Sequence, residues 1–245
     1  MKLHVETVGN PDGQPMGCIH GFMSSNLQWR PNTDRLGEDL QLLLIEHPGH
    51  GQSPTPADPD DFGRAAVLAA IDQVRDDRGF EKWWIVGHSM GGAMALHYAL
   101  AYPDRVHGVV FTNSRAVFGT GAAARPKPEP VKDLRTLPYH PIHAKRFDED
   151  LKADMVTVAD AMDPEAIVNV ITKIGEWAAA SELPRLQVPA LLVNGQWEKA
   201  FQPHVADAQA AIADLTVVTL EGGHSINIEN AEGFDRAVLD FVKRR

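Results

Sequence analysis

The stretch 83-WWIVGHSMGGAM-94 places one serine, Ser89, among glycines where an apolar strand ends and a helix begins. With Gly87 two residues before it and Gly91 two residues after it, the serine fits the G-x-S-x-G pattern of a nucleophile elbow. A serine that projects from so tight a turn leaves no room for side chains at those two positions. The helix that follows directs its N–H groups and positive dipole end at the reacting centre. The stretch therefore predicts that Ser89 is a nucleophile.

The composition is that of an ordinary globular protein. The chain has 245 residues, of which 44% are hydrophobic and 23% charged, enough for one large domain with a sizeable core. A net charge of −10 argues against a nucleic-acid or anionic-membrane partner. The one cysteine, Cys18, excludes an intrachain disulfide and a Cys-rich metal site.

The chain shows neither a basic-then-apolar leader at its N-terminus nor a stretch approaching the ~20 apolar residues of a membrane span. We therefore expect no membrane span, and a cytoplasmic location follows by default. The sequence leaves the oligomeric state open.

Short apolar strands alternate with helical patterns over most of the chain, which indicates an α/β fold with a mostly parallel open sheet and helices on both faces. The predicted strands are 3–8, 16–19, 42–45, 83–86, 106–112, 190–193 and 215–220. The predicted helices are 64–75, 90–102, 203–212 and 231–242.

The alternation breaks at about residue 117. Residues 119–130 (GTGAAARPKPEP) are too rich in Gly and Pro for a core element, and 144–180 then look helical throughout. The alternation of strands and helices resumes at Pro189. We therefore expect residues 117–186 to form a helical insertion, and residues 1–116 and 187–245 to form one core.

A nucleophilic serine needs a base, and His224 is the best placed of eleven histidines. It lies in the glycine-rich loop after the last strand, from which an imidazole can reach the carboxyl edge of the sheet. We interpret His140, His143 and His204 as surface or packing residues. No acidic or Cys partner stands at the right spacing to make His140 and His143 a metal site, so we expect none.

The base needs an orienting acid, and Glu198 is the one carboxylate in the loop 193–199 after the strand before last. The chain order Ser89, Glu198, His224 is the order of nucleophile, acid and histidine that is expected of this architecture. A solvated glutamate beside Lys199 is the alternative interpretation.

The turn HGFM at 20–23 also follows a strand. Such a turn aims a backbone N–H at the serine, and together with the N–H of Met90 it makes a two-donor oxyanion hole. An ordinary strand-end turn is the alternative.

These features together resemble the α/β-hydrolase superfamily, and within it the compact hydrolases with a helical lid. The matching segments are HGFM (20–23), HPGHGQSP (47–54), GHSMGG (87–92), NGQWEK (194–199) and GGH (222–224). The resemblance implies a Ser–acid–His triad, a lid over the pocket, and Phe22 and Met90 as the two N–H donors of the oxyanion hole.

Two positions depart from the family pattern. Glu198 and Glu46 each stand where the family usually has Asp. The longer side chain of Glu198 must approach His224 from a different angle. An alternative acid position, at the end of the strand 106–112, holds Asn113, which favours Glu198.

The expected chemistry is a carboxylesterase-like acyl transfer to Ser89, with His224 as base, on a small-molecule ester, thioester or lactone of small or medium acyl length. It needs no metal or organic cofactor. A carbon–carbon bond hydrolase, a cofactor-free lyase and a ligand-binding receptor with residual hydrolysis are the alternatives.

If the insertion is a lid, some of its apolar side chains must line the pocket while the others pack its helices. The candidates are Phe118, Tyr139, Phe147, Met155, Met162, Ile167, Ile171 and Trp177.

Overall fold

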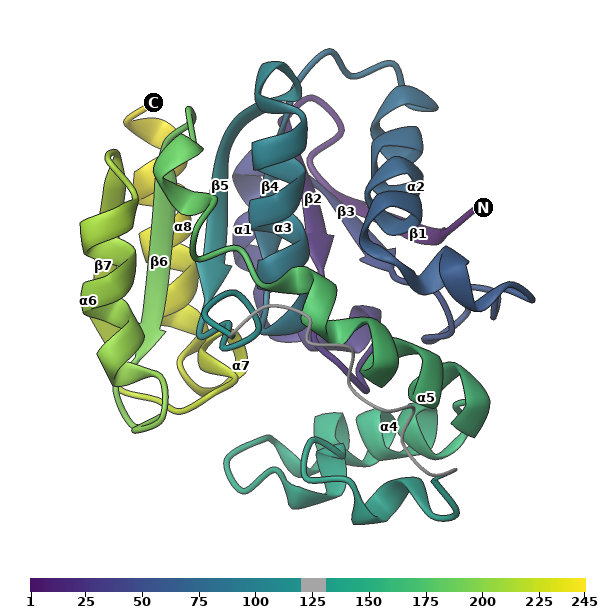
Figure 1. Cartoon of the computed structure of the whole chain (residues 1–245). Coiled ribbons are helices and arrows are strands. Elements are labelled where there is room, and N and C mark those ends of the chain that lie inside the picture. The colour runs from purple at the N-terminus through teal and green to yellow at the C-terminus, as the bar shows by residue number, and fades with distance from the viewer. Residues whose placement is uncertain (120–130) are drawn as a thin grey trace.

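A computed structural model, which describes residues 1–119 and 131–245, shows a seven-stranded sheet with helices on both faces (Figure 1). The strands are β1 (His4–Gly9), β2 (Gln14–Ile19), β3 (Leu40–Glu46), β4 (Trp83–Gly87), β5 (Val106–Thr112), β6 (Ala190–Gly195) and β7 (Leu215–Leu220). The α/β class and the seven predicted strands are confirmed. Residues 120–130, which make up most of the Gly- and Pro-rich stretch not expected to form a core element, lie outside the described residues.

The strands lie in the order β1-β3-β2-β4-β5-β6-β7. Strand β1 runs antiparallel to β3, and all the other neighbours are parallel. Every residue of β4 is buried, as expected for a central parallel strand covered on both faces. Strand β1, at the edge, is partly exposed along its whole length. The alternating pattern of β1 predicted a strand but not its direction.

Helices α2, α3 and α6 pack on one face of the sheet, and α1 and α8 pack on the other (Figure 1). The α-helices are α1 (Thr33–Asp39), α2 (Arg64–Asp76), α3 (Met90–Ala101), α4 (Glu149–Asp160), α5 (Pro164–Lys173), α6 (Gln202–Ala211), α7 (Ile226–Glu229) and α8 (Ala231–Lys243). Short 3-10 helices span Asn26–Asn32, Pro59–Phe62, Pro103–Arg105, Leu134–Thr136, Pro141–His143, Ile174–Trp177 and Leu183–Arg185.

The part of the insertion that the structure describes is helical but not continuously so. Asp148 caps α4 by accepting the N–H groups of Asp150 and Leu151, and Asp163 caps α5 by accepting the N–H of Glu165. The expected helix over 144–180 is therefore interrupted, because these aspartates begin new helices. In Figure 1 the insertion lies across the edge of the sheet at which the parallel strands end.

Ion pairs join the insertion to the core. Arg30 lies 2.5 Å from Asp154 of α4, and Lys173 of α5 lies 2.8 Å from Asp60.

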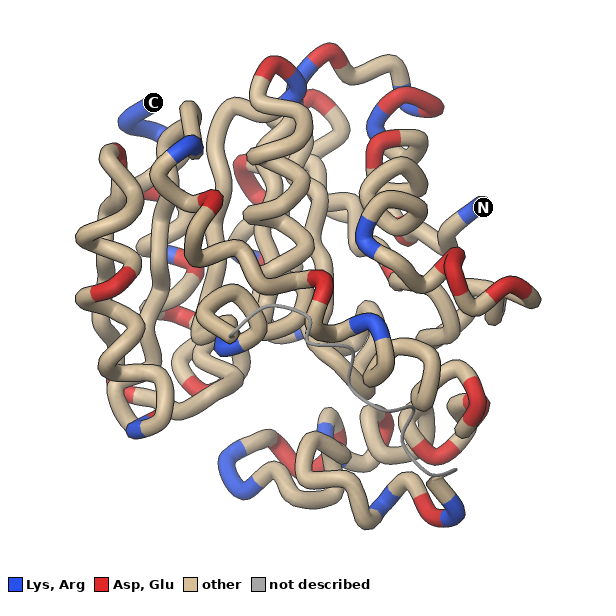
Figure 2. The backbone as a smooth tube through the Cα atoms, viewed as in Figure 1, with Lys and Arg blue, Asp and Glu red and all other residues tan. Residues whose placement is uncertain are grey.

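Acidic and basic residues are interspersed along the chain in Figure 2. Among the described residues, no helix has both the length and the apolar character required to cross a membrane.

Candidate active site

Ser89 stands at the tip of the turn between β4 and α3 in a backbone conformation that side chains rarely adopt, with φ 53° and ψ −114°. A Cβ at Gly87 would lie 2.0 Å from the carbonyl oxygen of Gly91, and a Cβ at Gly91 would lie 2.3 Å from that of Ile19. Both glycines are therefore required by close approach of the backbone. Strained residues of this kind cost about 1–3 kcal/mol and persist only when their surroundings hold them.

Three hydrogen bonds hold the turn. The His88 N–H donates to the carbonyl of Ile19 over 3.0 Å, and the Ser89 N–H donates to the Thr112 hydroxyl over 3.3 Å. The same hydroxyl lies 2.9 Å from His88 Nδ1. Strands β2 and β5, the two neighbours of β4, thus fix the serine from both sides.

The structure brings Ser89, His224 and Glu198 together. His224 Nε2 lies 2.9 Å from Ser89 Oγ, and His224 Nδ1 lies 2.9 Å from Glu198 Oε2. Because a carboxylate only accepts hydrogen bonds, Nδ1 carries the proton and Nε2 is free to accept the serine proton. The Glu198 side chain is 14% exposed and that of His224 is 36% exposed, so the carboxylate is the more buried partner of this contact.

The alternative acid position at the end of β5 has another partner. Asn113 accepts the N–H of Gly195 over 2.9 Å and donates to its carbonyl over 3.1 Å. It thereby fixes the end of β6, from which the Glu198 loop begins. Gln202 holds that loop by donating to the carbonyl of Glu198 over 3.1 Å.

The two residues assigned to the oxyanion hole line the same cavity as Ser89. Phe22 and Met90 both line it, and neither N–H donates to another described residue. Met90 is the first residue of α3, where helical N–H groups have no partner within the helix. The neighbouring Met23 has a positive φ of 57° and donates its N–H to His50 Nε2 over 3.3 Å. The donor role itself stays a prediction.

Three buried histidines lie behind this turn. The rings of His20 and His47 stack 4.1 Å apart, and those of His47 and His50 lie 3.8 Å apart. Burial lowers the pKa of His20 to about 3 and that of His50 to about 4. The neutral ring of His50 donates from Nδ1 to the carbonyl of Pro48 over 3.0 Å and accepts the N–H of Met23 at Nε2.

Ser89, Glu198 and His224 line a cavity of about 870 Å³ between the core and the insertion. Of the apolar side chains expected from the insertion, four line this cavity: Phe118, Tyr139, Phe147 and Met155. The other four pack in hydrophobic clusters instead: Met162, Ile167, Ile171 and Trp177. The three histidines interpreted as surface or packing residues, His140, His143 and His204, also line the cavity, a role that the sequence did not indicate.

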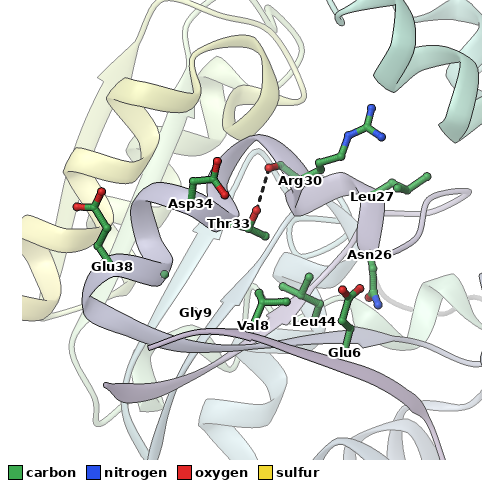
Figure 3. A pocket seen from close by; sticks show the side chains of 11 residues that line it. Glu6, Val8, Gly9, Asn26, Leu27, Arg30, Thr33, Asp34, Glu38 and Leu44 are labelled. Atoms are coloured by element: carbon green, nitrogen blue, oxygen red, sulfur yellow. Dashed lines mark hydrogen bonds between the residues drawn. The ribbon is translucent and has the colours of Figure 1, made fainter. Parts of the chain in front are cut away.

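A second hollow, of about 510 Å³, lies between β1 and the segment that leads into α1 (Figure 3). Its lining includes the carboxylates Glu6, Asp34 and Glu38 and the guanidinium of Arg30. None of the triad residues lines it, and its lining contains no histidine. The cavity at Ser89 is therefore the candidate active site. Within residues 1–119 and 131–245, no three His, Cys, Asp or Glu side chains are placed to hold a metal ion.

The comparisons with known proteins agree with this fold. A family model described as the alpha/beta hydrolase fold matches residues 14–231. The chain is 24% identical to 3-oxoadipate enol-lactonase 2 of Acinetobacter baylyi, covering 100% of this chain and 94% of the relative. It is 25% identical to 2-succinyl-6-hydroxy-2,4-cyclohexadiene-1-carboxylate synthase of Serratia proteamaculans, covering 96% and 95%. The crystal structure of the enol-lactonase from Burkholderia xenovorans LB400 matches 98% of this chain and 96% of its own, with a TM-score of 0.84 and 24% identity.

The elbow predicts unequal responses at two adjacent glycines. Gly91→Ala should lower the free energy of unfolding by about 3 kcal/mol or more, because its Cβ would meet backbone atoms that cannot move. Gly92→Ala is the comparison, since its Cβ would meet its nearest atom, the carbonyl oxygen of Gly87, at 3.1 Å, and the helix preference of alanine offsets part of that tighter contact, so its cost should be smaller. Urea unfolding measures both. Equal stabilities would contradict the close approach.

The buried histidines predict loss of stability in acid. Their pKa values are lowered on folding, so below about pH 6.5 the unfolded chain takes up protons that the native chain does not. Stability is therefore full above that pH and falls toward pH 4, by at most about 1.4 kcal/mol per pH unit for each histidine. Asp235, whose raised pKa of about 7 has the opposite effect, offsets one of them.

Urea unfolding at pH 7 and at pH 5 measures this effect. Replacing His50 with Gln, which keeps an acceptor for the N–H of Met23, should make the pH dependence shallower. A parent protein equally stable at both pH values would contradict the assignment of these histidines as neutral.

Proposed function

The chain belongs to the α/β-hydrolase fold family, and we propose that it is a serine hydrolase that cleaves a small or medium acyl ester, thioester or lactone. The observation that carries the proposal is the continuous hydrogen-bonded path from Ser89 Oγ through His224 to Glu198, with both distances at 2.9 Å. A nucleophile, a base and an orienting carboxylate within hydrogen-bond reach are what acyl transfer requires.

The reaction we propose follows from this path. Ser89 Oγ attacks the substrate carbonyl carbon while His224 Nε2 takes the serine proton. The negative oxygen that develops is stabilised by the N–H groups of Phe22 and Met90. As the bond between the carbonyl carbon and the leaving oxygen or sulfur breaks, His224 gives the proton to that atom, which leaves an acyl group on the serine. Water, deprotonated by His224, hydrolyses that ester and restores Ser89.

In this proposal the insertion acts as a lid over the cavity. Its side chains line the cavity together with those of the core, and its small cluster of Leu134, Met162 and Ile167 includes Met23, next to the proposed oxyanion donor. A cavity that excludes water strengthens each electrostatic contact within it. The division at residues 117 and 186 remains part of the proposal.

A cofactor-free lyase is the second candidate, because one of the relatives is named as a cyclohexadiene-carboxylate synthase. Such a reaction needs the base, and a lyase would release no alcohol or acid from an ester. Steady-state turnover of p-nitrophenyl esters of graded acyl length distinguishes the two enzymes, and it also excludes a receptor, which would show at most one turnover.

Ser89→Ala is expected to abolish ester hydrolysis while leaving the melting temperature within a few degrees of the parent, since little of the core depends on the hydroxyl. His224→Ala should lose a similar amount, and the double variant should be no worse than either because triad members act as a unit. Release of p-nitrophenol measures all three. Activity of Ser89→Ala within tenfold of the parent would refute the proposed function.

Glu198 gives a graded prediction. Glu198→Gln keeps the size of the side chain but permits the wrong imidazole tautomer, which in a comparable triad lowers kcat by about 10⁴-fold. Glu198→Asp keeps the charge and loses only reach, so kcat should fall less. The expected order of kcat is parent, Asp variant, Gln variant. A Gln variant as active as the parent would show that Glu198 does not orient His224.

A further inference from the structure

The loop that carries His224 is held from behind by one carboxylate. Glu229 is the last residue of the one-turn helix α7, which begins directly after this loop. Its Oε2 accepts the N–H of Gly223 over 2.8 Å, and its Oε1 accepts the N–H of Ser225 over 3.3 Å. These two residues flank His224 in sequence. A single side chain therefore fixes the backbone on both sides of the imidazole.

Glu229 is paired as well as hydrogen-bonded. Its side chain is only 8% exposed, and an isolated carboxylate at such a position would be costly. Arg146, from the insertion, places its guanidinium 3.2 Å from Glu229 Oε2. This cation lies against the carboxylate that accepts both N–H groups, and hydrogen bonds to a charged acceptor are roughly twice as strong as neutral ones.

Arg146 also contacts the loop of the proposed acid. Its guanidinium carbon lies 4.7 Å from the centre of the Trp197 ring, and Trp197 immediately precedes Glu198. The N–H of Trp197 donates to the carbonyl of Gly222, in the histidine loop, over 2.9 Å. One arginine of the insertion therefore reaches both loops that carry the partners of Ser89.

We propose that Glu229 is a positioning residue for His224, and that Arg146 acts through it by holding its carboxylate in place. The inference rests on the proposed function, because it takes His224 as the base. Neither side chain makes a hydrogen bond to the imidazole or to Ser89 in the part of the chain that the structure describes. Their effect passes through the backbone, where a displacement of about 1 Å can cost on the order of 10² in rate.

Two other roles predict different results. A purely structural carboxylate would lower the melting temperature without a specific loss of kcat. Because Glu229 and Arg146 line the cavity, a role in binding substrate is the second possibility, and it would raise KM. The chain offers a matched control in Glu176, which accepts the N–H of Arg64 over 2.9 Å, lies 3.5 Å from Lys173, and does not line the cavity.

The experiment compares Glu229→Gln, Arg146→Gln and Glu176→Gln in the full chain, with p-nitrophenyl butyrate as substrate and the melting temperature measured for each. Glu229→Gln should lower kcat by about 10²-fold with little change in KM. Arg146→Gln should lower kcat by a smaller factor, and Glu176→Gln should leave kcat unchanged.

A double-variant cycle tests whether Glu229 acts through His224. In a His224→Ala background, Glu229→Gln should cause no further loss, because the side chain that it positions is gone. If Glu229→Gln does not fold, Arg146→Gln takes its place in the same cycle. The Arg146 side chain is 54% exposed, so its replacement should disturb folding less.

The inference is overturned by an equal loss in both backgrounds, by a rise in KM at constant kcat, or by parental kcat in a folded Glu229→Gln. Its failure is distinguishable from failure of the proposed function. If Ser89→Ala is inactive while folded Glu229→Gln keeps parental kcat, only the positioning role is lost. If Ser89→Ala keeps its activity, the proposed function fails.

Discussion

The close contact between the start of α3 and the end of β2 determines how the site is built. Gly91 approaches so near that an added Cβ would lie 2.3 Å from the carbonyl oxygen of Ile19 and 2.4 Å from that of His20. This contact lays the first turn of α3 against the end of β2, and Ser89, just before that turn, has a positive φ of 53°. Because His20 begins the turn that carries Phe22, the same contact sets the distance between the serine and the proposed oxyanion donor.

A second close approach brings in the other half of the site. A Cβ at Gly195, at the end of β6, would lie 2.0 Å from the carbonyl oxygen of Gly223, so the acid and histidine loops touch backbone to backbone. Asn113 ties Gly195 back to β5, beside the elbow strand. The site is thus fixed by backbone contacts at the carboxyl ends of neighbouring parallel strands, which is where an open α/β sheet places its ligands.

Sequence reasoning reached those features that local patterns encode. The apolar strand before Ser89, the glycines around it and the glycine-rich loop at His224 each have a physical cause within a few residues. It did not reach the hydrogen bonds that join Asn113 to Gly195, 82 residues away, or the antiparallel direction of β1, which depends on pairing with β3. Glu229 was missed for another reason: a carboxylate in a short helix looks solvated until the loop folds back onto it.

Glu46 and Glu198 stand where the family usually has aspartate. In both, the longer side chain brings the carboxylate to a hydrogen-bond partner. Glu46 is buried and accepts the N–H groups of Asn26 and Gln52 over 3.1 and 2.6 Å, thereby joining two loops. The loop of Glu198 is held back by Gln202, and its side chain still reaches Nδ1 at 2.9 Å. An aspartate on the same backbone would stop short by about one carbon–carbon bond, roughly 1.5 Å. With the backbone of this loop held in place by Gln202, the extra length of the glutamate side chain is what brings its carboxylate to His224.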